Sequence, residues 1–323
     1  MRCAFVRGAG LLGVILTLTG IAAPQSSAAV TGKQRVLVVL AAYGARTFAR
    51  DQMTQTLTQV GAFLQTSSYG RMSLEATVTP WLDAGFSAPS CAGAVRTILP
   101  ERLLVPVRAA AKRAGYNLAA YDRVIFSVTG SDCVFQGAAA DEQVLLTGQP
   151  DIRTIVHELG HTWGLAHAAA AERCGSFCVT QEEGDPFTPM GVGFGDFSAY
   201  EKELLGWIDP QPRLTKPGRY VIYPTAARKG LHALVLNAVD GQYWIEQRPD
   251  RATPALIVRV VHPDEPDWPF AAASTLILGP IRPGHSTILP GQTFAVRGSF
   301  SVRLGLGKKT PAQLRLRLSA SFR

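Results

Sequence analysis

The chain has 323 residues, of which 47% are hydrophobic and 17% are charged, a composition typical of a folded protein and not of a disordered one. Its formal net charge is +8, but the positive residues are spread along the chain without a long basic run. A dedicated nucleic-acid surface is therefore not expected. A general preference for acidic surfaces would fit this charge.

The N-terminal residues have the pattern of a secretory signal peptide. Arg2 and Arg7 precede an apolar run at 8–23, which is followed by small residues up to Ala29. We predict a signal peptide at 1–29, removed after Ala29, and a secreted, extracellular protein. The run is short for a membrane span, which needs about 20 apolar residues, so no stable membrane insertion is expected after cleavage. A retained membrane anchor is the alternative.

The cysteines beyond the predicted signal peptide are Cys91, Cys133, Cys174 and Cys178. An even number in an exported protein suggests disulfide bonds, and three pairings are possible. We predict pairs between Cys91 and Cys133 and between Cys174 and Cys178. As an alternative, the second pair could bind a second metal ion.

The next segment is expected to alternate strands and helices. Apolar residues recur at helical spacing in 47–66 and again after Pro100, so both stretches should pack as helices on a sheet. Strands are expected at 35–40, 72–78, 124–128 and 144–146; the first and third read as strands buried on both faces. We expect 144–146 at the sheet edge beside a substrate cleft, where a peptide can bind by strand addition.

Residues 152–167 read IRTIVHELGHTWGLAH and contain three histidines and a glutamate at metal-binding spacing. On a helix, His157 and His161 lie one turn apart on the same face, so both imidazoles can bind one ion. Glu158 projects from nearly the same side. Its carboxylate is expected to reach a water on the metal and not the metal itself.

The helix is expected to end near Gly164, because glycine readily adopts the left-handed conformation that terminates helices. The turn would then bring His167 back as a third ligand. Three protein ligands leave a fourth position for water, as in catalytic zinc sites. The sequence therefore predicts one catalytic zinc ion, with Glu158 as the general base.

This HExxHxxGxxH spacing resembles the signature of the metzincin metallopeptidases, in which a Met-turn follows. Residues 184–191, GDPFTPMG, look like that turn, and the resemblance implies that Met190 lies under the metal. More narrowly, the chain is similar to the gametolysin-like secreted peptidases. That resemblance rests also on 68–71, SYGR, and on 205–207, LGW, and it covers residues 35–210.

The resemblance implies an α+β fold, with a zincin-like metallopeptidase catalytic domain at 30–210 and a helix at 198–205 in its lower half. Two features depart from related peptidases. Val192 stands where some metzincins have a tyrosine ligand, and few residues separate the predicted cleavage site from the first strand, which leaves little room for an inhibitory pro-segment.

A change in composition at 209–212, DPQP, marks the expected start of a smaller all-β, sandwich-like domain at 211–323. Short alternating runs separated by turn residues predict an antiparallel arrangement. The expected strands are 220–223, 233–236, 242–246, 256–261, 275–278, 293–296, 300–304 and 314–318.

The sequence thus predicts a secreted zinc endopeptidase that acts on protein or peptide substrates. The alternatives are a non-catalytic zinc-binding protein on a zincin scaffold, used for adhesion or for binding carbohydrate or protein, and a zinc hydrolase that acts on other substrates. Glu182, Glu183 and Asp185 form an acidic cluster that could bind calcium, although a solvated loop is the favoured interpretation. The oligomeric state does not follow from the sequence.

Overall fold

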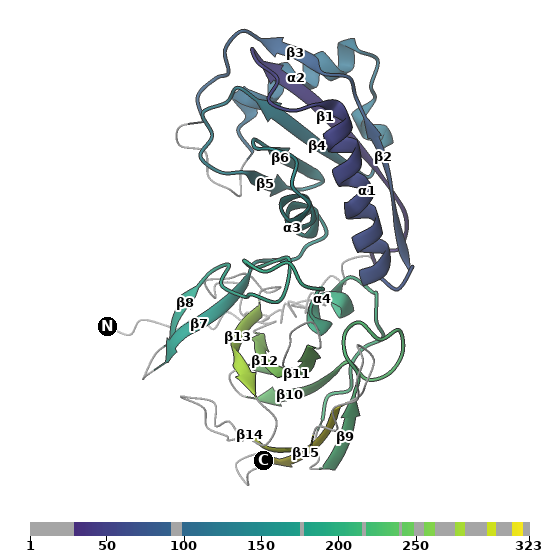
Figure 1. Cartoon of the computed structure of the whole chain (residues 1–323), viewed down its shortest axis with the longest axis vertical. Helices are drawn as coiled ribbons and strands as arrows, with labels where there is room; N and C mark the ends of the chain where they lie inside the picture. Colours follow the sequence, from purple (N-terminus) through teal and green to yellow (C-terminus); the bar gives the residue numbers. More distant parts are fainter. Residues whose placement is uncertain are drawn as a thin grey trace, which may run out of the picture.

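The structure, a computed structural model, describes residues 29–91, 99–174, 178–214, 218–238, 241–248, 255–261, 275–281, 296–301 and 312–318. The predicted signal peptide lies, except for Ala29, outside the described residues. Within the described segments, no helix combines the length and the apolar character that a membrane span requires. The fold is mixed α and β, with a mostly parallel sheet in the N-terminal part and further strands below it (Figure 1).

The first sheet contains six of the described strands. They are β1 (Gly32–Tyr43), β2 (Met72–Val78), β3 (Leu82–Gly85), β4 (Arg123–Thr129), β5 (Gly137–Ala140) and β6 (Gln143–Leu146). Their order is β2-β1-β4-β6-β5, and β3 pairs with the far end of β1. All pairs are parallel except that of β5 with β6.

Alternate residues of β1 face opposite layers, as the period of a strand requires. Val36, Val38 and Leu40 pack in one core with α1 (Arg50–Ser67) and α3 (Ile152–Thr162). Leu37, Val39 and Ala41 pack in a second core with α2 (Glu101–Arg113). The prediction of a first strand buried on both faces is confirmed. A short 3-10 helix, η1 (Leu118–Ala120), leads into β4.

The predicted position of 144–146 at the sheet edge is wrong. These residues form β6, which lies between β4 and β5, so the edge strand is β5. The sequence of β5 is GAAA, which lacks the β-branched and aromatic residues that indicate strands. Its pairing with β6 decides its conformation.

Below α3 the chain forms the hairpin β7 (Ala168–Cys174) and β8 (Cys178–Gln181), then the short helix α4 (Ala199–Leu204) (Figure 1). Ser198 and Glu201 cap α4 with reciprocal hydrogen bonds. The hairpin belongs to a second sheet of order β10-β11-β12-β13-β7-β8. Its other strands are β10 (Ala233–Ala238), β11 (Gly241–Arg248), β12 (Ala255–Val261) and β13 (Thr275–Ile281).

A separate antiparallel sheet consists of β14 (Val296–Ser301), β15 (Ala312–Leu318) and β9 (Gly218–Ile222). The C-terminal part is thus rich in antiparallel strands, as predicted; residues 293–295 of the strand expected at 293–296 lie outside the described residues. The hairpin β7–β8 pairs with β13 through β7, in parallel register. Strands from both predicted domains therefore share one sheet, and the division at residue 210 stays a prediction.

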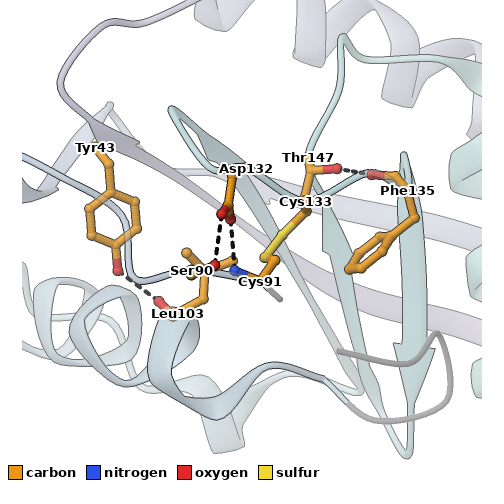
Figure 2. Close-up of a disulfide and its surroundings, with 8 residues drawn as sticks. All are labelled: Tyr43, Ser90, Cys91, Leu103, Asp132, Cys133, Phe135 and Thr147. Atoms are coloured by element: carbon orange, nitrogen blue, oxygen red, sulfur yellow. Dashed lines mark hydrogen bonds between the residues drawn. A yellow bond between two sulfur atoms is a disulfide. The ribbon is translucent and has the colours of Figure 1, made fainter. Parts of the chain in front are cut away.

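The predicted pairing of Cys91 with Cys133 is confirmed, because these residues form a disulfide across 42 positions of sequence (Figure 2). Asp132 fixes the segment that carries Cys91: its carboxylate accepts hydrogen bonds from the backbone N–H of Cys91, at 2.7 Å, and from the hydroxyl of Ser90, at 2.8 Å. Cys174 and Cys178 are directly opposite in the β7–β8 register. Their side chains lie outside the described part of the chain.

Candidate metal centre

Helix α3 carries the first two histidines. Its N-cap residue, Asp151, accepts a hydrogen bond from the backbone N–H of Thr154 at 2.8 Å. Ile155, Val156 and Leu159 are fully buried in the core under the first sheet, which fixes the rotation of the helix. His157 and His161 therefore project together from the opposite side.

The helix ends near Gly164, as predicted from the sequence. Gly164 has a φ of +86°, and the N–H groups of Leu165 and Gly164 donate to the carbonyls of Gly160, at 3.0 Å, and His161, at 2.9 Å. This is a Schellman turn. It reverses the chain and places the carbonyl of Leu165 2.8 Å from Nδ1 of His161.

The reversal brings His167 to the start of β7, facing the other two imidazoles. The ring centroid of His161 lies 4.6 Å from that of His157 and 4.7 Å from that of His167, and the centroids of His157 and His167 are 5.2 Å apart. One ligand atom from each ring lies within 4.8 Å of the others, so this group could hold a metal ion. It is the only such group of three or more histidine, cysteine or acidic side chains in the described residues.

Met190 lies beneath the triad. It is fully buried, and its carbonyl accepts a hydrogen bond from the N–H of Ala168 at 2.8 Å. A Cβ atom added at Gly160 would overlap the sulfur of Met190, so the thioether lies directly against the helix between the two histidines. Pro189, one residue earlier, places its carbonyl 2.8 Å from Nδ1 of His157.

Each ring has a hydrogen-bond acceptor at its Nδ1 atom. The acceptors are the carbonyls of Pro189 and Leu165 and, for His167, Oε1 of Glu182 at 2.8 Å. Because a carbonyl or carboxylate oxygen can only accept, each Nδ1 carries a hydrogen. Each Nε2 of a neutral ring then presents a lone pair.

Burial keeps the first two rings neutral. It lowers the pKa of His157 to about 4 and that of His161 to about 3, and the neighbouring imidazoles add to the effect. Nε2 of His157 and Nε2 of His161 nevertheless lie only 3.0 Å apart. Two lone pairs at that distance repel each other, and a cation between the rings removes the repulsion.

Glu158 lies in the same cleft and is 6% exposed. The cleft has a volume of about 340 Å³ and is lined by the three histidines, Glu158 and the edge strand β5. A Cβ at Gly137, the first residue of β5, would overlap the Glu158 carboxylate. The absence of a side chain at this position therefore makes room for the predicted base.

The three carboxylates of the acidic cluster do not converge on a common point where a cation could bind. Glu182 contacts Nδ1 of His167, and Oε1 of Glu183 lies 3.7 Å from Nε2 of the same ring. Asp185 is fully buried and forms an ion pair with Arg259 of β12. The geometry thus gives no support to calcium binding by this cluster.

The two further stretches singled out in the sequence, 68–71 and 205–207, contact each other. The Arg71 guanidinium donates to the carbonyl of Gly206 at 3.0 Å, and Nε1 of Trp207 donates to the carbonyl of Val30 at 2.8 Å. The Tyr69 ring lies 4.3 Å from the fully buried ammonium of Lys202 on α4. These contacts join the end of α1, the first strand and α4.

Sequence reasoning named the histidines, Glu158 and Met190 but missed three neighbours. Gly137 had no signal in the sequence. Glu182 was visible only as part of an acidic cluster. Arg153, which lines the cleft, could have been found from its position one helical turn before His157.

The chain matches no protein-family model, and none of the curated proteins matches it. The resemblance to metzincins therefore stays a prediction from the sequence motifs.

Proposed function

We propose that this protein is a secreted zinc-dependent endopeptidase. The observation that carries the proposal is the convergence of one ring nitrogen from each of three histidines, with a hydrogen-bond acceptor at Nδ1 of every ring. Neutral imidazole nitrogens are typical ligands of zinc, and three protein ligands are typical of catalytic zinc sites. The residues present fit that ion.

Glu158 supports the hydrolytic part of the proposal. It follows the first histidine directly and is buried in the cleft that the histidines line. Its carboxylate would accept the proton of the attacking water and deliver it to the leaving amine. A bound zinc ion would supply the Lewis acid that polarises the peptide carbonyl and activates the water.

The edge strand supports a peptide as the substrate. Among the described strands, β5 pairs only with β6, so one edge of β5 has no strand beside it. Residues 134–139 line the cleft next to Glu158. An extended peptide can add to such an edge by main-chain hydrogen bonds, whatever its side chains. The predicted signal peptide and the Cys91–Cys133 disulfide support an extracellular location.

The test is cleavage of casein, an unstructured protein, by the purified mature protein loaded with zinc. We expect cleavage by the wild type, and a loss of at least about 100-fold with Glu158→Gln, which keeps the side-chain shape but not the base. Glu75→Gln, a surface change on β2, is the matched control and should cleave normally. If zinc-loaded wild type cleaves neither casein nor a peptide library, a binding protein or a hydrolase of other substrates replaces the peptidase proposal.

A further inference from the structure

Arg153 is a charged residue in the cleft that the proposed reaction does not use. It lies in the first turn of α3, one turn before His157, and its side chain lines the cleft together with Thr154, His157 and Glu158. Its Nη2 atom donates to the carbonyl of Gly191, immediately after Met190, at 3.1 Å. Its Nε atom is buried and has no hydrogen-bond partner among the described residues.

A guanidinium has five N–H donors in a planar fork, and the contact with Gly191 uses one of them. A buried donor without a partner costs free energy, so such groups call for an explanation. A carboxylate satisfies the fork with two parallel hydrogen bonds and also neutralises the charge. Among the described residues, no carboxylate satisfies the Nε atom of Arg153.

We propose that Arg153 binds a carboxylate of the substrate, so that the enzyme prefers peptides with an acidic group close to the scissile bond. This inference rests on the proposed peptidase function and names its substrate class. The carboxylate can come from an Asp or Glu side chain or from the C-terminus of the peptide. Both sources present the same bidentate acceptor.

A bound divalent cation would offset the acidic groups around the cleft. Glu158 and Glu183 line it together with Arg153, and Glu182 contacts His167. With a divalent cation at the triad these charges would sum to about zero, so an anionic substrate would not meet a net negative cleft. The formal charge of +8 falls to +6 without Arg2 and Arg7 of the predicted signal peptide, and this excess would favour the approach of acidic peptides over longer distances.

The experiment compares matched peptides that carry Glu, Gln or Lys at each position within three residues of one scissile bond, all with amidated C-termini. We expect the wild type to have a kcat/KM for at least one Glu peptide about 10-fold or more above that of its Gln partner, as for a hydrogen bond between charged groups. Arg153→Gln should reduce that ratio to near 1. Arg153→Lys should restore part of it, and Arg153→Glu should favour the Lys peptide.

Two controls separate the explanations. Arg102→Gln removes an exposed charge from α2, on the opposite face of the sheet, and should leave the ratio unchanged. A second series of peptides with a free C-terminus distinguishes the two sources of the carboxylate. A preference found only in that series would mean that Arg153 binds the C-terminal carboxylate of the peptide.

An equal fall in cleavage of all peptides by Arg153→Gln would overturn the inference, because Arg153 would then only hold the Gly191 carbonyl. A wild type without preference for any carboxylate would overturn it as well. In both cases the peptidase proposal stands, since peptides are cut. If the wild type cuts no peptide, the proposed function fails, and the inference fails with it.

Discussion

His167 differs from the other two histidines in the group that orients it. Backbone carbonyls hold His157 and His161, whereas the Glu182 carboxylate holds His167 from the loop after β8. A carboxylate at Nδ1 fixes the orientation of the ring and raises the basicity of the other nitrogen, and its loss typically weakens metal binding 10- to 100-fold.

We therefore expect Glu182→Gln to weaken zinc binding about 10-fold, at the low end of that range because the Glu182 side chain is 62% exposed. Competition with a chromophoric chelator measures the affinity. Glu75→Gln, whose carboxylate pairs with Lys33 at 2.8 Å on the far edge of the sheet, should bind zinc like the wild type. Equal affinities of the Glu182 variant and the wild type would show that the Schellman turn and β7 alone orient His167.

Gly137 offers a way to separate catalysis from metal binding. A methyl group at this position would overlap the Glu158 carboxylate, and Glu158 is not one of the three proposed ligands. We expect Gly137→Ala to lower peptide cleavage at least about 10-fold, because a base displaced by about 1 Å loses its alignment with the water. Zinc affinity should not change.

Gly148→Ala is the matched control, since an added Cβ there would make only ordinary contacts, at 3.7 Å, with Gln136. Cleavage rates and zinc content, measured on the same preparations, provide the comparison. Full activity of Gly137→Ala would mean that Glu158 does not work from the position described.

The zinc-motif residues could be predicted because their geometry is local. Helical periodicity places His157 beside His161, and Gly164 adopts the backbone conformation that only glycine reaches without strain. The contacts of Glu182 and Gly137 could not be predicted, because each joins segments 15 or more residues apart. Such contacts depend on tertiary packing, which no local pattern encodes.

At the scale of elements, the periodicity of apolar residues predicts the helices and the apolar strands, but it does not predict strands that consist mainly of alanine. Residues 168–171 are a run of alanines that shows no strand signal, yet they begin β7, which pairs with β8 and with β13. As with β5, hydrogen bonds to neighbouring strands outweigh weak intrinsic propensity. The sheet that β7 shares with the C-terminal strands was consequently missed.

A buried ion cluster links that shared sheet to the Met-turn. Arg259 on β12 contacts Asp185 and, through Nε, the Glu246 carboxylate at 3.0 Å on β11; all three side chains are at most 1% exposed. Glu246 also accepts a hydrogen bond from the N–H of Ala199, the first residue of α4, at 2.7 Å. The cluster therefore connects two C-terminal strands to the loop under the metal site.

We expect Arg259→Met to lower the free energy of unfolding by about 3–5 kcal/mol, because it removes the guanidinium that pairs with two buried carboxylates. Urea denaturation of the metal-free protein measures the change, with Arg102→Met on the exposed face of α2 as the control. Adding Asp185→Asn and Glu246→Gln to Arg259→Met removes the uncompensated charges and should recover most of the loss. A single variant as stable as the wild type would contradict this account of the cluster.

At the scale of the whole molecule, the candidate metal centre lies between two layers of structure. His157 and His161 belong to α3, which packs on the first sheet, whereas His167 leads directly into β7 of the second sheet (Figure 1). Only five residues, 162–166, separate His161 from His167 along the chain. An ion bound by the three histidines would thus cross-link α3, which packs on the first sheet, to the second sheet.

Removal of the ion should destabilise the whole protein. Binding only to the folded state adds about 4.1 kcal/mol at a free-metal concentration 1,000 times the dissociation constant. We expect that a chelator lowers the urea midpoint of the zinc-loaded protein and that the shift grows with the logarithm of zinc concentration. Native-state proteolysis at 163–167 should become faster in parallel, since the turn between the sheets loses its anchor.

The variant His167→Ala separates this cross-link from binding to α3 alone. It keeps two ligands on the helix, so it should bind zinc much more weakly, and zinc should no longer slow proteolysis of the turn. The metal-free forms of variant and wild type should unfold at similar urea concentrations, because His167 is at the surface of the cleft and not in the core. If zinc protects the turn equally in both proteins, the two helix ligands suffice and the ion does not tie the second sheet to the first.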